Sequence, residues 1–324
     1  MNKKVLVTGG AGYIGSAVVR HLLVKGYNVH TMDNCSMGSD GIFSFIGYPN
    51  YTFHKGDIRN LNEVKKAVED VDYVVHLAAI VGEPACRKFK DDAKTINIDG
   101  TKNVFNLSQE KNVKRFIFFS TCSSYGVQDI NIMANENTAL NPVSLYAETK
   151  IEMENFIKEN ISNDMFYTIL RPSTVHGPSP RMRFDLIVNH FVKDAVLNGE
   201  LEIFGGSLWR PLMWVGDAGR AIERVLTAEK ELVCNEIFNM GNTENNFQKK
   251  EIANILKNKF LHNLKIISHK EDSDLRSYKV DFSKIENNLD FKLEKSIEQS
   301  IQELIYVCSH NLIEDYNHMK FRNH

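Results

Sequence analysis

The feature that most constrains this sequence is a run of glycines directly after its first apolar segment. Residues 4–8 are typical of a short buried strand, and Gly9, Gly12 and Gly15 follow before an amphipathic stretch begins. Glycines at this spacing permit a tight turn and a close approach of the backbone to a diphosphate. A helix that starts here also offers free N–H groups and its positive dipole end to that anion. Glycine turns also occur without a ligand, so this alternative stays open.

The first half of the chain alternates short apolar runs with amphipathic stretches. This pattern predicts strands at residues 4–8, 27–32, 51–55, 72–77, 115–120 and 167–170, and helices at 14–24, 61–68, 95–110 and 147–159. Buried parallel strands joined by covering helices produce such an alternation. We therefore expect an α/β fold with a Rossmann-type doubly wound parallel sheet.

The pattern changes after Arg171 and Pro172, where Gly177, Pro178 and Pro180 interrupt it. We place a boundary there. Residues 1–171 are expected to form the dinucleotide-binding domain, and residues 172–324 a smaller α+β lobe that binds the substrate. Parts of 212–240, such as 218–227 and 236–240, are expected to return to the first domain.

Composition narrows the class of protein. The formal charge of -2 gives no electrostatic reason for binding nucleic acid. The five cysteines lie far apart without a Cys-x-x-Cys pair, which indicates neither a disulfide framework nor a metal site and fits a reducing compartment. No apolar run approaches the roughly 20 residues that span a bilayer, and no export signal is recognised. We expect a cytoplasmic protein with no membrane partner.

Asp33 closes the second predicted strand, roughly 20 residues after the glycine turn, where a carboxylate can accept hydrogen bonds from a ribose diol. Asn34 and Cys35 follow it, so neither of the next two residues is a cation that could bind a ribose phosphate. This favours NAD over NADP. A turn or cap role for Asp33 is the alternative.

Tyr146 and Lys150 form a Tyr-x-x-x-Lys pair on one face of a predicted helix. Chance alone produces on the order of one such pair in a chain of this size. The position of the pair gives it weight, because it follows a strand that ends at Ser120 and Thr121. In a doubly wound sheet, strand ends and the loops after them form the ligand crevice.

Taken together, these motifs resemble the extended short-chain dehydrogenase/reductase family, in particular its nucleotide-sugar epimerases, dehydratases and reductases. The resemblance covers nearly the whole chain. It rests on the Thr8 to Gly15 turn, Gly56-Asp57-Ile58, His76-Leu77-Ala78-Ala79, Asn97, Ser120-Thr121 with Tyr125-Gly126, Tyr146 with Lys150, Arg171-Pro172, and Trp209-Arg210-Pro211 leading to Asp217.

The resemblance implies an NAD-dependent enzyme whose acid/base is Tyr146, assisted by Lys150 and Thr121. The implied cofactor-binding residues are Gly9, Gly12, Tyr13, Ile14, Gly15, Asp33, Asn34, Asp57, Ile58, Leu77, Ala78, Ala79, Asn97, Ser120, Tyr146, Lys150 and Pro172. For the nucleotide-sugar substrate, the residues are Thr121, Cys122, Ser123, Thr174, Arg181, Arg183, Asn189, Arg210, Asp274 and Tyr278.

The resemblance also implies a homodimer in which the helices that begin near Thr95 and Ala147 pack as a four-helix bundle. The apolar residues Val104, Phe105, Phe156 and Ile157 suit that interface. They suit the face toward the sheet equally well.

The chemistry that this constellation favours is hydride transfer at C4 of the sugar. An alcohol releases hydride only if its proton leaves nearly together with it, so the base needs a pKa close to neutrality. A nearby ammonium and an oxidised nicotinamide both stabilise phenolate. We therefore expect Tyr146 to titrate well below free tyrosine when NAD is bound.

At several positions this chain differs from known branches of the family, and these differences bear on the net reaction. Dehydratases of the family carry Asp-Glu after the Ser/Thr, whereas this chain has Cys122 and Ser123, which disfavours 4,6-dehydration. A 4-epimerase and a net 4-dehydrogenase or reductase remain. Thr174 and Glu271 replace an asparagine and an arginine that are usual in UDP-galactose 4-epimerases. Residues 179–185 resemble branches that act on unusual GDP-, CDP- or TDP-linked sugars or heptoses.

Several alternatives stay open on sequence alone. Cys122 with His176 resembles the thiol and imidazole of 3,5-epimerases, although a buried thiol and a structural histidine are the default interpretations. Arg181 and Arg183 are either diphosphate clamps or surface charges that pair with Asp185. A catalytically silent, NAD-binding regulatory protein is the main alternative to an enzyme.

Overall fold

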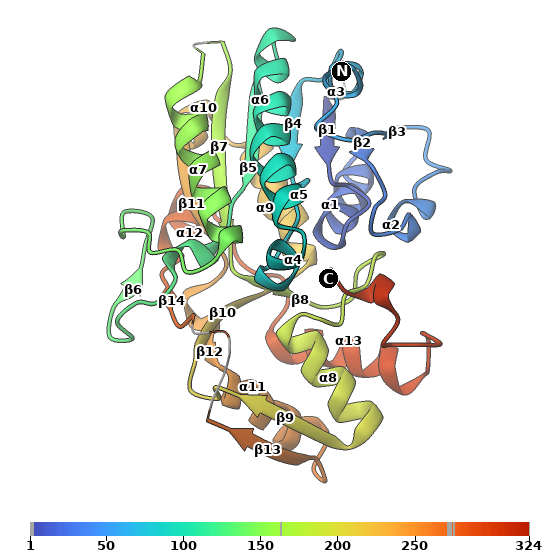
Figure 1. Ribbon diagram of the computed structural model, residues 1–324, viewed down its shortest axis with the longest axis vertical. Coiled ribbons are helices and arrows are strands. Elements are labelled where there is room, and N and C mark those ends of the chain that lie inside the picture. The colour runs from blue at the N-terminus through green and yellow to red at the C-terminus, as the bar shows by residue number, and fades with distance from the viewer. Residues whose placement is uncertain (1–2, 163, 271–273, 275, 324) are drawn as a thin grey trace.

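A seven-stranded parallel sheet forms the centre of the upper part of the molecule (Figure 1). The computed structural model describes residues 3–162, 164–270, 274 and 276–323. The strand order is β11-β7-β5-β4-β1-β2-β3, and every neighbouring pair is parallel. The strands are β1 Lys4–Thr8, β2 Asn28–Asp33, β3 Tyr51–Lys55, β4 Tyr73–His76, β5 Arg115–Phe119, β7 Phe166–Pro172 and β11 Glu236–Met240.

Helices cover both faces of this sheet because its strands are apolar on both sides. In β5, Phe116 and Phe118 pack into one core, whereas Ile117 and Phe119 pack into the other. Successive side chains of a strand point to opposite faces, so an uninterrupted apolar run requires two cores. The first core includes α3 Leu61–Ala67, α6 Thr101–Glu110 and α7 Leu145–Asn160, and the second includes α1 Tyr13–Val24, α9 Gly216–Thr227 and α12 Ser283–Leu289.

The expected doubly wound sheet is confirmed, and the predicted elements of the first half are present with small shifts at their ends. One difference is local. The predicted helix 95–110 begins with a π-helical segment, Thr95–Gly100, before α6. A side chain at Gly100 would meet Ile58 at 2.6 Å, so this widened turn packs closely against a predicted cofactor-binding residue.

The lower part of the molecule is built from short strands and three longer helices (Figure 1). Its core includes Val192, Leu201, Leu212, Ile252 and Ile301. The helices are α8 Ile187–Asn198, α11 Lys249–Ile255 and α13 Ile297–Ser309, and the strands are β8 Thr174–His176, β9 Glu200–Phe204, β10 Trp209–Trp214, β12 Asn246–Gln248 and β13 Lys265–His269. Strand β10 pairs with β8 and β12, and β9 pairs with β13.

Between these segments the chain goes back to the large sheet, where β11 pairs with β7 and α9 packs on α1. The division of the chain at residue 171 stays a prediction. The smaller elements are α2 Asp40–Phe43, α4 Glu83–Lys88, α5 Lys90–Lys94 and α10 Lys230–Val233, with β6 Met133–Ala134 paired to β14 Lys279–Val280. In the part of the chain that the structure describes, no helix has the length and apolarity to cross a bilayer.

The residues considered for a dimer interface mostly face inward. Val104, Phe105 and Ile157 are fully buried in the core between the sheet and α3, α6 and α7, and Phe156 is half-buried at its edge. Val104, Phe105 and Ile157 therefore serve the fold of one chain, and a bundle between two copies would have to use Phe156 and other residues of α6 and α7.

Helix α7 is fixed to the sheet by a buried ion pair. The Arg171 guanidinium at the end of β7 donates to both oxygens of Glu154, with N–O distances of 2.9 and 2.6 Å. Ser120, at the end of β5, donates to the same carboxylate, and Arg171 also contacts the Tyr125 hydroxyl at 3.1 Å. Both charged side chains are at most 3% exposed. The pair ties α7 to the carboxyl ends of two strands.

Replacing Glu154 by alanine should destabilise the protein strongly, because it leaves the Arg171 charge buried without its partner. The expected loss in free energy of unfolding is about 3–5 kcal/mol, measured by chemical denaturation. The double variant Glu154→Met with Arg171→Met should recover most of this loss, since it removes both charges. Equal losses in the single and double variants would show that the ion pair does not carry the effect.

Candidate active site

The glycine turn lies between β1 and α1 and leaves no room for side chains. Gly9 has a φ of +73°, and its N–H donates to the Met32 carbonyl at 2.8 Å. A Cβ at Gly9 would lie 2.7 Å from the backbone nitrogen of Ala78, and a Cβ at Gly15 would lie 2.0 Å from the Gly9 carbonyl. These close approaches expose the first turn of α1 to a ligand, as a diphosphate requires.

Asp33 faces the same turn from the end of β2. Its carboxylate accepts from the backbone N–H groups of Ala11 at 3.0 Å and Cys35 at 2.8 Å. Burial raises its pKa, while these two hydrogen bonds act in the opposite direction. Next to it, Asn34 donates to Asp57 at 3.2 Å, and Arg59 holds the pKa of Asp57 at about 2. The carboxylates at this end of the sheet are therefore held in fixed positions.

One cavity collects the predicted cofactor residues. All of them except Asn97 line it: Gly9, Gly12, Tyr13, Ile14, Gly15, Asp33, Asn34, Asp57, Ile58, Leu77, Ala78, Ala79, Ser120, Tyr146, Lys150 and Pro172. Asn97 lies behind the wall, where its side chain accepts from the Ile80 N–H at 2.8 Å and donates to the Ile80 carbonyl at 3.0 Å. The glycine turn, the Asp33 carboxylate and a lining that extends as far as Tyr146 and Lys150 fit a dinucleotide.

Tyr146 and Thr121 form the reactive centre of this arrangement. The Thr121 side chain lies close enough to the Tyr146 phenol to lower its pKa, and the Thr121 hydroxyl accepts from the Ser123 N–H at 3.0 Å. Burial raises the pKa of Tyr146, whereas the charges of Arg183 and Arg276 oppose that rise. In the described structure the phenol is thus protonated at neutral pH, and a base of lower pKa needs the further cationic charge that a bound cofactor supplies.

Lys150 lies one helical turn after Tyr146 and is 3% exposed. Its ammonium donates to the Phe119 carbonyl at 2.7 Å and lies over the Phe118 ring, 4.8 Å from its centre. Burial lowers the pKa of Lys150 to about 8. Glu154 follows one turn further, so Tyr146, Lys150 and Glu154 occupy one face of α7 at four-residue spacing.

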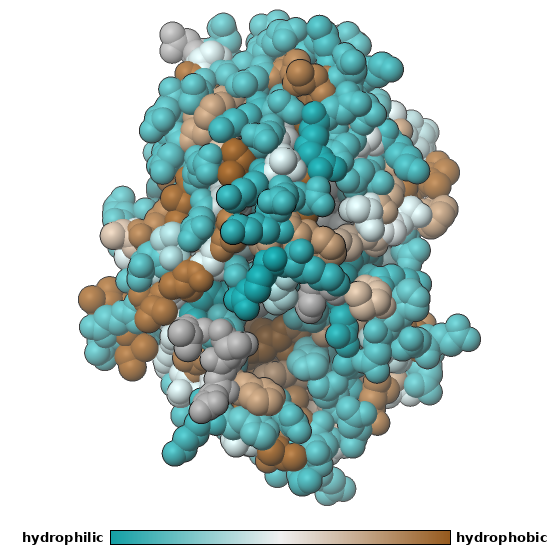
Figure 2. Space-filling view, viewed as in Figure 1, coloured by the Kyte–Doolittle hydropathy of each residue, from teal (hydrophilic) through white to brown (hydrophobic). Residues whose placement is uncertain are grey.

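A second, larger cavity of about 1870 Å³ opens between the two parts of the molecule. Figure 2 shows this face hollowed, with hydrophilic residues around the opening and apolar residues deeper inside. Both cavities are lined by Tyr146, Pro172 and Arg183, so they meet at the phenol. Of the predicted substrate residues, the lining of the larger cavity includes Thr121, Ser123, Thr174, Arg183, Arg210 and Asp274.

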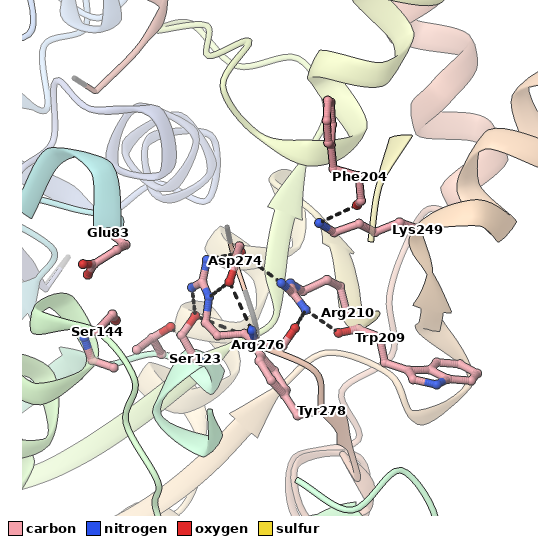
Figure 3. Close-up of polar contacts among 12 residues, drawn as sticks. Glu83, Ser123, Ser144, Phe204, Trp209, Arg210, Lys249, Asp274, Arg276 and Tyr278 are labelled. Carbon is pink, nitrogen blue, oxygen red and sulfur yellow. Dashed lines mark hydrogen bonds and ion pairs between the residues drawn. The ribbon is translucent and has the colours of Figure 1, made fainter. Parts of the chain in front are cut away.

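A charged cluster of Arg210, Asp274 and Arg276 lines this cavity (Figure 3). Asp274 accepts from Arg210 at 2.9 Å and from Arg276 at 2.7 Å, and the two cations hold its pKa well below its usual range. Arg276 also donates to the Ser123 hydroxyl at 3.0 Å. Arg276 was missed because only its neighbours Asp274 and Tyr278 match a family pattern. Glu271, which replaces a usual arginine, lies outside the described residues.

Other predicted substrate residues lie outside this lining. Tyr278 is buried, and its hydroxyl lies 3.4 Å from the Ser123 hydroxyl. Asn189 is fully buried and holds the backbone of the loop, accepting from the Gly177 N–H at 2.9 Å and donating to the Arg183 carbonyl at 2.8 Å. Arg183 itself pairs with both oxygens of Asp185 at 2.9 and 2.8 Å. Arg181 lines the cofactor cavity instead.

The structure does not favour the hypothesis that Cys122 and His176 act as the acid and base of a 3,5-epimerase. The Cys122 thiol points away from the cavity and donates to the Arg171 carbonyl at 3.0 Å, and burial raises its pKa well above the usual value. His176 contacts Ser300 at 2.8 Å, and burial lowers its pKa to about 3. Both are buried core groups, and neither side chain lines either cavity.

Comparison with known proteins gives a consistent result. The NAD dependent epimerase/dehydratase family matches residues 5–241. A putative UDP-glucose 4-epimerase of Methanocaldococcus jannaschii is 27% identical over 314 residues, which cover 95% of this chain and 99% of that protein. A UDP-glucose 4-epimerase of Thermotoga maritima, solved with UDP-glucose, has a TM-score of 0.85 at 26% identity, covering 96% and 100% of the two chains.

A different kind of relative matches over a shorter stretch. A 3-beta-hydroxysteroid dehydrogenase of Mycolicibacterium neoaurum is 30% identical over 214 residues. That match covers 63% of this chain but only 55% of the steroid enzyme.

The buried Lys150 should give the cofactor-free protein a specific pH dependence. Its pKa falls from 10.5 to about 8 on folding, so folding pays a penalty below pH 8 that fades as pH rises toward 10.5. Relative to Lys150→Met, the wild type should therefore gain about 2–3 kcal/mol of stability between pH 7 and pH 10. The exposed Lys158→Met on the same helix is the control, and its curve should run parallel to the wild type. Parallel curves for Lys150→Met would contradict the buried ammonium.

Proposed function

The chain belongs to the NAD-dependent epimerase/dehydratase family, and from that premise we propose that it epimerises C4 of a nucleoside-diphosphate sugar through a 4-keto intermediate. It is an NAD-dependent enzyme of the extended short-chain dehydrogenase/reductase type. The observation that carries the proposal is the position of Tyr146 at the junction of the two cavities, with Thr121 beside it.

The residues of this chain have distinct roles in the proposed reaction. Residues of the smaller cavity, among them Gly9, Asp33 and Lys150, would hold NAD, which would supply the acceptor and donor of the hydride. Tyr146 removes the proton of the sugar hydroxyl and later returns it, while Thr121 holds the oxygen in line. Lys150 adds positive charge to the cofactor side, and Arg183 and Arg276 do so on the substrate side. These charges stabilise the phenolate that burial alone would disfavour.

The substrate cavity favours a diphosphate over an apolar ligand. Among the described residues, Arg210 and Arg276 flank one carboxylate, Asp274, and Glu83 also acts on Arg276. Guanidinium groups match phosphate oxygens in geometry and charge. Such a cluster suits a nucleotide sugar better than a steroid, which has no anionic group for the two guanidinium groups to bind. UDP-glucose and UDP-galactose are the first candidates, since relatives of matching length are named as UDP-glucose 4-epimerases.

The residues after Thr121 support C4 chemistry without loss of water. Cys122 is buried against the Arg171 carbonyl, and Ser123 contacts Arg276. Neither side chain offers the carboxyl acid/base that dehydration requires. The alternative net reaction, a 4-dehydrogenase that releases the ketone, uses the same residues and differs only in whether the keto sugar leaves.

We also propose a cytoplasmic homodimer. The five cysteines are free thiols, which fits a reducing compartment. With Val104, Phe105 and Ile157 committed to the core, the outer faces of α6 and α7 remain for an interface. They carry the Lys102–Glu152 ion pair at 3.7 Å and the half-buried Phe156.

Tyr146→Phe should lower kcat for the interconversion of UDP-glucose and UDP-galactose by at least about 100-fold, since it removes the acid/base but keeps the ring. NADH binding, followed by fluorescence, should persist in this variant. Cys122→Ser is the matched control and should keep turnover, because its hydroxyl can still donate to the Arg171 carbonyl. A Tyr146→Phe enzyme of normal kcat would refute the assignment of the base.

A further inference from the structure

Arg181 is a buried cation whose surroundings place it on the cofactor side. It is 4% exposed and lines the cavity that also contains Asp33 and the glycine turn. Its terminal nitrogens donate to the Asn323 side chain at 2.9 Å and to the Arg322 carbonyl at 3.1 Å. Its Nε is buried and has no hydrogen-bond partner among the described residues. A buried donor without a partner is unfavourable, so a ligand that accepts from it is favoured.

The loop that carries Arg181 is attached to the first turn of α1. Ser179 donates to the Tyr13 carbonyl at 2.6 Å, and the Arg181 N–H contacts the Ser16 hydroxyl at 3.4 Å. The Tyr13 hydroxyl donates back to the Gly177 carbonyl at 2.6 Å. The same turn of α1 offers its free N–H groups to a diphosphate. The guanidinium is therefore fixed beside the segment that binds the phosphates of a dinucleotide.

Residues 316–323 hold this cation from the other side. The Phe184 N–H donates to the Phe321 carbonyl at 2.9 Å, and the Phe184 ring packs against Tyr316 and Phe321 with centroid distances of 5.2 and 5.8 Å. The Asn323 N–H donates to Asp185 at 3.2 Å. The segment thus joins the loop 177–185, and Asn323 itself lines the cofactor cavity.

The charges around Arg181 indicate an anionic ligand. Arg183 and the carboxylates of Asp185, Asp33 and Asp40 act on it through space, but the side-chain contacts of its guanidinium are to the neutral Asn323 and a backbone carbonyl. Asp185 is paired with Arg183. Asp33 is already engaged with the N–H groups of Ala11 and Cys35. A buried guanidinium with only neutral hydrogen-bond acceptors has an unmet preference for a phosphate oxygen.

We propose that Arg181 binds the pyrophosphate of NAD through its free Nε–H and that residues 316–323 position it. This assignment moves Arg181 from the substrate, where the sequence placed it, to the cofactor. The second arginine of the run, Arg183, lines both cavities, and its charge is balanced by Asp185. A cofactor clamped in this way is retained while a hydride leaves and returns, as a redox-neutral epimerase needs.

The test compares ligands that do or do not carry the pyrophosphate, with binding to purified, cofactor-free protein measured by calorimetry. Arg181→Gln should weaken NADH and ADP-ribose about 10- to 100-fold, as expected for loss of a charge-assisted hydrogen bond. Adenosine should bind as before. NADH release, followed by fluorescence after a chase with NAD, should be faster by a similar factor. Unchanged affinities in a folded variant would overturn the proposal.

Two further variants separate binding from positioning. Asn323→Ala removes the acceptor that holds Arg181 and should weaken ADP-ribose by a smaller factor. Arg322→Ala is the matched control, because it removes a neighbouring guanidinium but keeps the carbonyl to which Arg181 donates, and it should leave ADP-ribose affinity unchanged. Equal effects of these two variants would count against the positioning role.

Two outcomes distinguish the remaining alternatives. If Arg181→Gln weakens UDP but not NADH, Arg181 is a substrate clamp and the proposal is wrong. If Arg181→Gln does not fold, Arg181→Lys keeps the charge but loses the Nε–H and should still weaken ADP-ribose relative to adenosine. An unchanged ratio in that variant would overturn the proposal. None of these measurements depends on which sugar the enzyme uses.

Discussion

The buried ion pair between Glu154 and Arg171 is the contact on which the reactive centre depends. It joins α7 to the carboxyl ends of β7 and β5, two strands that lie side by side in the sheet. Because Tyr146 and Lys150 share the same face of the helix, this one attachment also sets the depth and rotation of both. Ion pairs of this kind add little net stability, yet they are costly to break. Here the pair fixes the positions of the Tyr146 phenol and the Lys150 ammonium in the wall of the cavities.

The same geometry keeps the ionisable groups Tyr146 and Lys150 buried at the carboxyl ends of the strands. All strands of the large sheet are parallel, so their carboxyl ends gather Asp33, Leu77, Thr121 and Pro172 along one edge. Burial disfavours both the Lys150 ammonium and the Tyr146 phenolate. Each charged form becomes favourable only with the other charges of the assembled complex nearby, which links acid/base activity to the presence of the cofactor and substrate.

Much of the fold and the cofactor site was predictable from sequence because the signals are local. Short apolar runs and helical patterns predicted the sheet, and a glycine turn with an acid after the next strand predicted much of the cavity lining. The substrate side was harder, since contacts between distant segments decide it. Arg181 lines the cofactor cavity, whereas Arg183, two residues later, lines both cavities, because residues 316–323 and Ser16 hold Arg181 while Asp185 holds Arg183. Cys122 and Asn189 were misjudged because backbone groups hold them: Cys122 donates to the Arg171 carbonyl, and Asn189 contacts the backbone of the loop 177–185.

The most direct test of this account follows the hydrogen on C4. The enzyme is given UDP-glucose or UDP-galactose deuterated at C4, or the nucleotide sugar that proves to be its substrate, and both epimers are analysed by mass spectrometry and NMR. The account predicts that the deuterium stays on C4 of the product, because the hydride moves to the bound cofactor and returns within the same site. Deuterium found in water, or carried away on released NADH with a free keto sugar, would contradict it.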